Sequence, residues 1–139
     1  MRLVMQLDLP ADARLLPRTR RAIAGYLEEM GGGPEDIDDV VLALDEACAN
    51  VIRHALPSQP QANFQLSAQV DDDEIIVEVT DAGCGFPVDA VTGQPDDPES
   101  TSGRGLRMIR HLMTTVEVES PTAEGGTRLR MRKRLEGTD

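Results

Sequence analysis

Two side chains four residues apart, Glu46 and Asn50, have the types and spacing that could carry out chemistry. On a helix such side chains are neighbours, one turn apart. A carboxylate can take up a proton, and an amide oxygen can bind a hard cation such as Mg²⁺. The alternative is that both are ordinary solvated residues on the outer face of an amphipathic helix. The helix alone favours that alternative, so the functional interpretation depends on other parts of the chain.

The stretch from residue 36 to residue 55 must position this pair. Its apolar residues recur at steps of three and four, which predicts a long helix with one buried stripe. The stripe consists of Ile37, Val40, Val41, Leu44, Cys48, Val51 and Ala55. At about 100° per residue, Glu46 and Asn50 fall on the face opposite the stripe. We therefore expect neither side chain to be part of the core.

A second candidate site lies where a predicted strand ends, at Asp81 followed by Gly83 and Gly85. The carboxylate of a lone Asp can accept a hydrogen bond from an exocyclic amine, such as that of adenine. The glycines would let the backbone approach a flat base closely. Asp81 can instead be a simple turn former, because Asp is common in turns.

Two more glycine motifs follow downstream. Gly103 and Gly105 precede a predicted helix, whose first N–H groups and dipole would favour phosphates. Gly125 and Gly126 come directly before Thr127, which opens the last predicted strand. Each motif alone is weak, because Gly-x-Gly and Gly-Gly also occur in tight turns. The order and spacing of all the motifs together indicate a nucleotide site.

The remaining pattern predicts one α/β domain over residues 1–139. We expect strands over residues 3–9, 63–70, 74–81, 115–119 and 127–133, and helices over 18–30, 36–55 and 106–113. Three acidic residues, 71–73, predict a hairpin turn. Residues 87–102 are rich in Pro, Asp, Ser, Thr and Gly, which predicts a mobile loop that could act as a lid.

Composition excludes several classes of function. The net charge of −11 argues against nucleic acid as a partner, because phosphate binding needs clustered cations. No apolar run is long enough to span a membrane, and no signal peptide is present. The two Cys and two His lack metal-site or disulfide spacing, which is typical of a reducing cytosol. Lys133 is the only lysine, and no Gly-Lys-Ser/Thr sequence of a Walker phosphate loop occurs.

Arg18, Arg20 and Arg21 form a basic cluster on the outer face of the first predicted helix, in an otherwise acidic chain. They could form a contact surface for a partner protein. They could equally be a solvated helix face, with Glu28 and Glu29 as local partners.

Four stretches of the sequence resemble the boxes of a known ATP-binding fold. EACANVIRHA, TDAGCGF, SGRGLRMIRHLM and GGTRLRMRK look like the N, G1, G2 and G3 boxes of the Bergerat-type fold of gyrase, the large heat-shock chaperone and sensor histidine kinases. The resemblance is strongest to bacterial anti-sigma factor serine/threonine kinases, and it extends from the first strand to Lys133. It implies a two-layer α/β sandwich, with a mixed, largely antiparallel sheet and helices on one face. No helix pair for dimerisation and phosphotransfer is present, so a complete sensor kinase is not expected.

The resemblance also implies residue roles, position by position. These are Glu46 as general base, Asn50 as Mg²⁺ ligand, Asp81 as adenine acceptor with Gly83 and Gly85 shaping the pocket, Gly103, Arg104 and Gly105 over the phosphates, and Thr127 near the base. His54 matches a family position that we interpret as structural.

The implied protein is a cytoplasmic homodimer that binds ATP or ADP with Mg²⁺. It would sequester a sigma factor and phosphorylate a serine on an anti-anti-sigma protein of the STAS type. An alternative of the same fold is a module that binds nucleotide and switches partners without catalysis. The presence of both Glu46 and Asn50 favours the kinase. A fragment of a DNA-topology or repair ATPase is disfavoured by the small size and the acidic charge.

Overall fold

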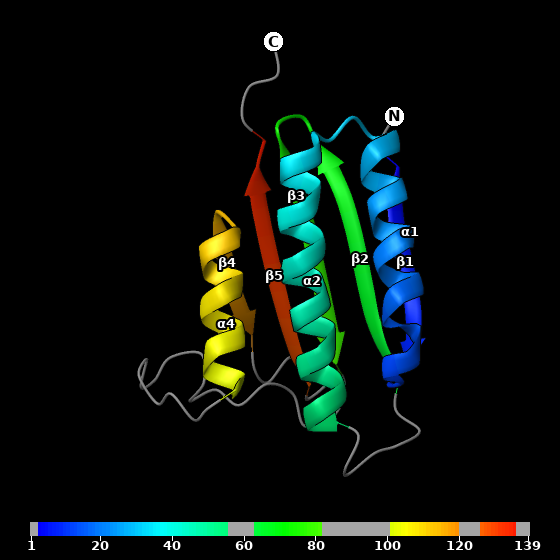
Figure 1. Cartoon of the computed structure of the whole chain (residues 1–139), viewed down its shortest axis with the longest axis vertical. Helices are drawn as coiled ribbons and strands as arrows, with labels where there is room; N and C mark the ends of the chain where they lie inside the picture. Colours follow the sequence, from blue (N-terminus) through cyan, green and yellow to red (C-terminus); the bar gives the residue numbers. More distant parts are fainter. Residues whose placement is uncertain (1–2, 56–62, 82–100, 120–125, 136–139) are drawn as a thin grey trace.

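The fold has two layers, a five-stranded sheet and a set of helices that covers one of its faces (Figure 1). The computed structural model describes residues 3–55, 63–81, 101–119 and 126–135. The strands are β1 (Val4–Pro10), β2 (Asn63–Asp71), β3 (Glu74–Asp81), β4 (Thr115–Glu119) and β5 (Thr127–Arg134). Their order in the sheet is β1-β2-β3-β5-β4, and all four pairings are antiparallel. The expected α/β sandwich is confirmed.

In the described part of the chain, the helical layer consists of a short 3-10 turn, η1 (Ala13–Leu15), and the helices α1 (Leu16–Glu29), α2 (Pro34–Ala55) and α4 (Thr101–Leu112). Gly31 ends α1 in a left-handed conformation, with φ of 92°, which glycine adopts without steric cost. Pro34 then occupies the first position of α2, where its missing N–H would have no helical partner. Among the described residues, no helix has the length and apolarity needed to cross a bilayer.

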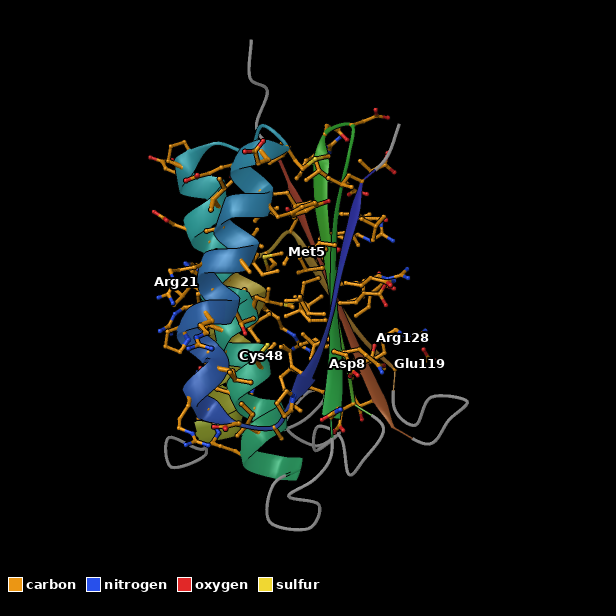
Figure 2. All side chains as sticks on the ribbon, turned by 90° about the vertical axis from the view of Figure 1, so that its right-hand side faces the viewer. Met5, Asp8, Arg21, Cys48, Glu119 and Arg128 are labelled. Atoms are coloured by element: carbon orange, nitrogen blue, oxygen red, sulfur yellow. The ribbon has the colours of Figure 1, made fainter. Side chains whose placement is uncertain are left out.

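The core lies between the two layers. Strand residues alternate, so one side chain in two faces the helices, and β2 buries Phe64, Leu66 and Ala68. Figure 2 shows Met5 of β1 and Cys48 of α2 pointing into this space. The other face of the sheet is polar and carries a row of arginines on β5 that pair with glutamates on neighbouring strands.

The start of α4 differs from the sequence prediction. The helix begins at Thr101, so the prediction of a loop through residue 102 and a helix from residue 106 is wrong at this boundary. Two glycines in the first five residues lower the intrinsic helix propensity, so the sequence pattern does not predict a helix in this first turn. Packing of α4 against α2 supplies stability that local propensity lacks. The rest of the predicted loop lies outside the described residues.

Candidate functional site

The predicted site elements meet at one end of the sandwich. Figure 1 shows the C-terminal end of α2, the end of β3, the start of β5 and the start of α4 all at the lower edge of the molecule. The antiparallel pairing of β3 with β5 explains part of this arrangement, because the end of one strand then lies beside the start of the other. Motifs that are far apart in the sequence thus gather around one edge.

Asp81 and Thr127 are brought directly together. They are register partners on β3 and β5, and each is only 1% exposed. Each of the two residues also has further interactions within the fold. A buried carboxylate beside a buried hydroxyl is a polar pair set into the otherwise apolar inner face of the sheet. Such a pair suits recognition of a polar base edge, as predicted for these two residues.

Glu46 and Asn50 lie on adjacent turns of α2, but the expectation that both avoid the core is wrong for Asn50. Asn50 is 1% exposed, whereas the side chain of Glu46 is 22% exposed. The buried arc of α2 is wider than the predicted stripe, since Ala43 and Ala47 are also fully buried. The cause is that α2 packs against α4 as well as against α1 and the sheet.

Arg53 joins these two side chains, and the sequence interpretation missed it. Its guanidinium Nη2 donates a hydrogen bond to Glu46 Oε1 at 3.2 Å and another to Asn50 Oδ1. The acceptor oxygens of Glu46 and Asn50 therefore converge on one cationic nitrogen. A signal for this contact was present in the sequence, because Arg53 follows Asn50 by three residues and Glu46 by seven, which is one helical face.

The amide of Asn50 has a further unusual property. Its Nδ2 atom is buried and has no hydrogen-bond partner among the described residues. Leaving a buried polar atom unsatisfied costs about 1–3 kcal/mol, so natural cores avoid it. A buried amide that is kept at this cost, with its oxygen aimed at a cation, fits a ligand-binding role better than a structural one.

These groups fit the magnesium that the fold family implies. Mg²⁺ prefers oxygen ligands and is usually held by one or two protein groups together with substrate phosphates and waters. Asn50 Oδ1 offers one such oxygen, at a point where a positive charge already lies. The described residues contain no cluster of His, Cys, Asp or Glu that could hold a metal without other ligands. Asn50 would therefore need phosphate oxygens to complete a Mg²⁺ site.

The glycine motifs are only partly placed. Gly103, Arg104 and Gly105 all belong to the start of α4, so Gly103 lies in its first turn. N–H groups of a first helical turn have no partner within the helix and can bind an anion. Gly83 and Gly85 lie outside the described residues. Arg18, Arg20 and Arg21 are all exposed, but Arg20 faces α2 and pairs with its Asp45, so the predicted outward-facing cluster is wrong for Arg20. Figure 2 shows Arg21 pointing away from the molecule.

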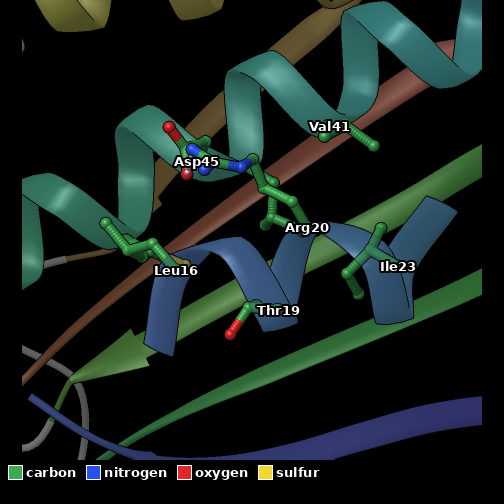
Figure 3. Close-up of a pocket in the computed structure, with 8 residues that line it drawn as sticks. Leu16, Thr19, Arg20, Ile23, Val41 and Asp45 are labelled. Atoms are coloured by element: carbon green, nitrogen blue, oxygen red, sulfur yellow. Dashed lines mark hydrogen bonds and ion pairs between the residues drawn. The ribbon is translucent and has the colours of Figure 1, made fainter. Parts of the chain in front are cut away.

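A small cavity between α1 and α2 is not the nucleotide site. Figure 3 shows its lining, which includes Leu16, Ile23 and Val41, with the ion pair of Arg20 and Asp45 beside it at 3.0 Å. Its volume is about 10 Å³, enough for a single water, whereas small-molecule sites usually measure hundreds of Å³.

Cys48, which also lines this cavity, is an inert thiol. Burial, and to a lesser degree the nearby charge of Asp45, raises its pKa to about 12. The thiolate is the reactive form of cysteine, so a thiol with this pKa stays protonated and unreactive at neutral pH. Cys48 therefore belongs to the core and not to a reaction centre.

Comparisons with known proteins identify the family of the chain. The family model of the histidine kinase-like ATPase domain matches residues 9–133. A serine-protein kinase RsbW of Bacillus velezensis is 28% identical over 141 residues, covering 96% of this chain and 86% of the relative. An anti-sigma F factor of Clostridium botulinum is 28% identical over 137 residues and 94% of each chain.

A solved structure shows the same fold. The chain containing the RsbU and RsbW domains of Rv1364c from Mycobacterium tuberculosis superposes with a TM-score of 0.73 at 20% identity, over 98% of this chain and 33% of that one. Because the family model spans most of the sequence, this protein belongs to the histidine kinase-like ATPase domain family.

Proposed function

We propose that this protein is an ATP-dependent protein serine kinase that also acts as an anti-sigma factor. The observation that carries the proposal is the convergence of Glu46 and Asn50 on one cationic position, at the same end of the fold as the buried pair of Asp81 and Thr127. The names of the relatives, serine-protein kinase RsbW and anti-sigma F factor, support both halves of the proposal.

In this mechanism the chain mainly positions groups and balances charge, as in other phosphoryl transfers. Asp81 would accept a hydrogen bond from the adenine amine, with Thr127 beside it. The first turn of α4, with Gly103, would donate N–H groups to the phosphates. Asn50 Oδ1 would hold Mg²⁺, which when bound neutralises phosphate charge. Glu46 would take the proton from the attacking serine hydroxyl, since that hydroxyl is a poor nucleophile without a base.

The proposed partners are a sigma factor and an anti-anti-sigma protein of the STAS type, which implies work in the cytoplasm. We propose that the protein acts as a homodimer, a state that light scattering would test. For the contact surface we propose the outer side of α1. Charge reversal at Arg21, which is exposed, should lower partner affinity and leave ATP affinity constant. Unchanged binding of both partners would contradict this surface.

The decisive experiment incubates the protein with labelled ATP and purified candidate anti-anti-sigma proteins from the same genome. We expect label on a serine of one candidate, only when Mg²⁺ is present. If nucleotide binds but no candidate is labelled, the protein is the non-catalytic switch module and the kinase proposal fails. If no nucleotide binds, both forms of the proposal fail.

A further inference from the structure

Arg53 occupies a position that the proposed mechanism does not use. Its single nitrogen Nη2 contacts Glu46 Oε1 and Asn50 Oδ1, the proposed base and the proposed metal ligand. The Arg53 side chain is 44% exposed, whereas Asn50 is 1% exposed. A half-exposed cation therefore lies against the oxygen of a buried side chain.

Two cations beside the same oxygen disfavour each other. A guanidinium that donates to Asn50 Oδ1 would be close to any metal ion held by the same oxygen, and like charges a few Å apart repel each other. A divalent ion bound at Asn50 would therefore weaken the contact between Arg53 and Asn50 and favour its release. The contact is suited to displacement, because exposed ion pairs are individually weak and the freed guanidinium can return to water.

We propose that Arg53 is a stand-in cation that competes with Mg²⁺ for the oxygen of Asn50 and holds Glu46 while the nucleotide is absent. This inference rests on the proposed function. With nucleotide absent, the contact orients the amide of Asn50 with its oxygen toward the site. It also keeps the Glu46 carboxylate paired with a cation until Mg²⁺ and nucleotide arrive together. Arg53 is thus a positioning residue that links metal binding to release of the base.

The competing explanation is an ordinary surface pair between residues on neighbouring helical turns. Such a pair would affect only the stability of α2 and would not change how strongly Mg²⁺ promotes nucleotide binding. The two explanations therefore differ in one measurable quantity, the ratio of the ADP dissociation constant without Mg²⁺ to that with saturating Mg²⁺.

The test measures this ratio by calorimetry, in EDTA and in excess Mg²⁺, for the full chain and three variants. Arg53→Gln removes the competing charge, so its ratio should rise about two- to fivefold, the range to which the strength of exposed ion pairs converts. Arg53→Lys keeps the charge and should stay near the wild-type ratio. Arg134→Gln, an arginine at the end of β5 whose side chain is 76% exposed, is the matched control and should leave the ratio unchanged.

A ratio for Arg53→Gln that is unchanged or lower would overturn the proposal, and a lower ratio would mean that Arg53 serves the loaded state. A ratio for Arg53→Lys as high as that for Arg53→Gln would equally overturn a competition based on charge. Thermal unfolding of each variant verifies that it is folded. If the wild-type protein bound no ADP at all, the proposed function would fail, and this inference with it. If the wild-type protein binds ADP but the Arg53 variants behave otherwise than expected, only this inference fails.

Discussion

The two ends of α2 differ in whether their polar groups are paired within the fold. At the N-terminal end, Lys133 Nζ donates to Asp39 Oδ2 at 3.0 Å and to the backbone oxygen of Leu112, the last residue of α4, at 2.7 Å. At the C-terminal end, Asn50 has a buried nitrogen with no partner among the described residues, and its oxygen accepts a hydrogen bond from the half-exposed Arg53. The first end is closed by its own side chains, and the second presents polar atoms that a ligand can satisfy.

This difference between the two ends of α2 separates groups that stabilise the fold from groups that are available to a ligand. Lys133 links β5, α2 and α4 through one ammonium group, so its partners are all within the fold. A wide hollow of about 1060 Å³ lies at this end, but it is lined by these mutually paired groups and by acidic residues. The size of this hollow therefore does not by itself make it a ligand site. Unsatisfied buried polarity and converging acceptor oxygens are better indicators of the ligand site.

The largest expected effect comes from Glu46→Gln at the ligand end. This change keeps the shape and removes the base, so phosphate transfer to the antagonist should fall by about 100-fold or more while ADP still binds. The measurement is the initial rate of serine labelling beside a calorimetric titration. Asp39→Asn is the control, because Asp39 lies on the same helix at the other end. If both variants lost the same fraction of the transfer rate, the two ends of α2 would not differ in their effect on catalysis.

Asp81→Asn should weaken nucleotide binding without disturbing the Lys133 contacts at the N-terminal end of α2. Losing a hydrogen bond to the base in a buried site costs about 1–3 kcal/mol, so ATP and ADP affinities should fall in parallel by about 5- to 150-fold. Calorimetry measures both. Asp72→Asn in the β2–β3 turn is the matched change at the other end, where φ is 49° and Asn is tolerated. Unchanged ADP affinity for Asp81→Asn would remove this carboxylate from the pocket.

Lys133→Met should lower the stability of the protein and leave nucleotide affinity unchanged, the reverse of what is expected for Asp81→Asn. The substitution keeps the aliphatic stem but leaves Asp39 and the Leu112 carbonyl without the ammonium group. Hydrogen bonds to charged groups contribute about 1.5–3 kcal/mol, and partial exposure of Asp39 reduces this, so unfolding free energy should fall by about 2 kcal/mol. Urea unfolding measures the loss, with Arg21→Gln expected to stay within about 0.5 kcal/mol. A stable variant with weakened ADP binding would contradict the assignment.

The sequence predicts much of this architecture because local patterns carry it. Strand β3 has the bounds expected from its alternating valines and isoleucines, and the β2–β3 hairpin turns at the acidic residues predicted for it. Each feature depends on neighbours a few residues away, which a single sequence displays. Predicting that Asp81 lies beside Thr127 requires knowing that β3 pairs with β5. The sequence shows which residues these are, but not that their strands are neighbours.

Two features could not be predicted, for the same reason. The burial of Asn50 and the early start of α4 both depend on the contact between α2 and α4, which periodicity along one helix does not contain. A helix with a second packing partner buries a wider arc than its apolar stripe, and small residues such as Ala43 and Ala47 fill the extra area. Polar residues inside that arc are then the ones to examine for function.

The smallest expected effect is the most discriminating, and it concerns the stability of Asn50→Ala. Truncating a well-satisfied buried side chain usually destabilises a protein, but this change removes a nitrogen that has no partner among the described residues. The lost bond to Arg53 and the removed penalty largely offset each other, so unfolding free energy should stay within about 1 kcal/mol of the wild type. The dependence of ADP affinity on Mg²⁺ should nevertheless disappear. Urea unfolding and calorimetry on the same preparation measure both quantities. A loss of stability as large as that of Lys133→Met would show that Asn50 serves the fold, and the contrast between the two ends of α2 would then have no functional meaning.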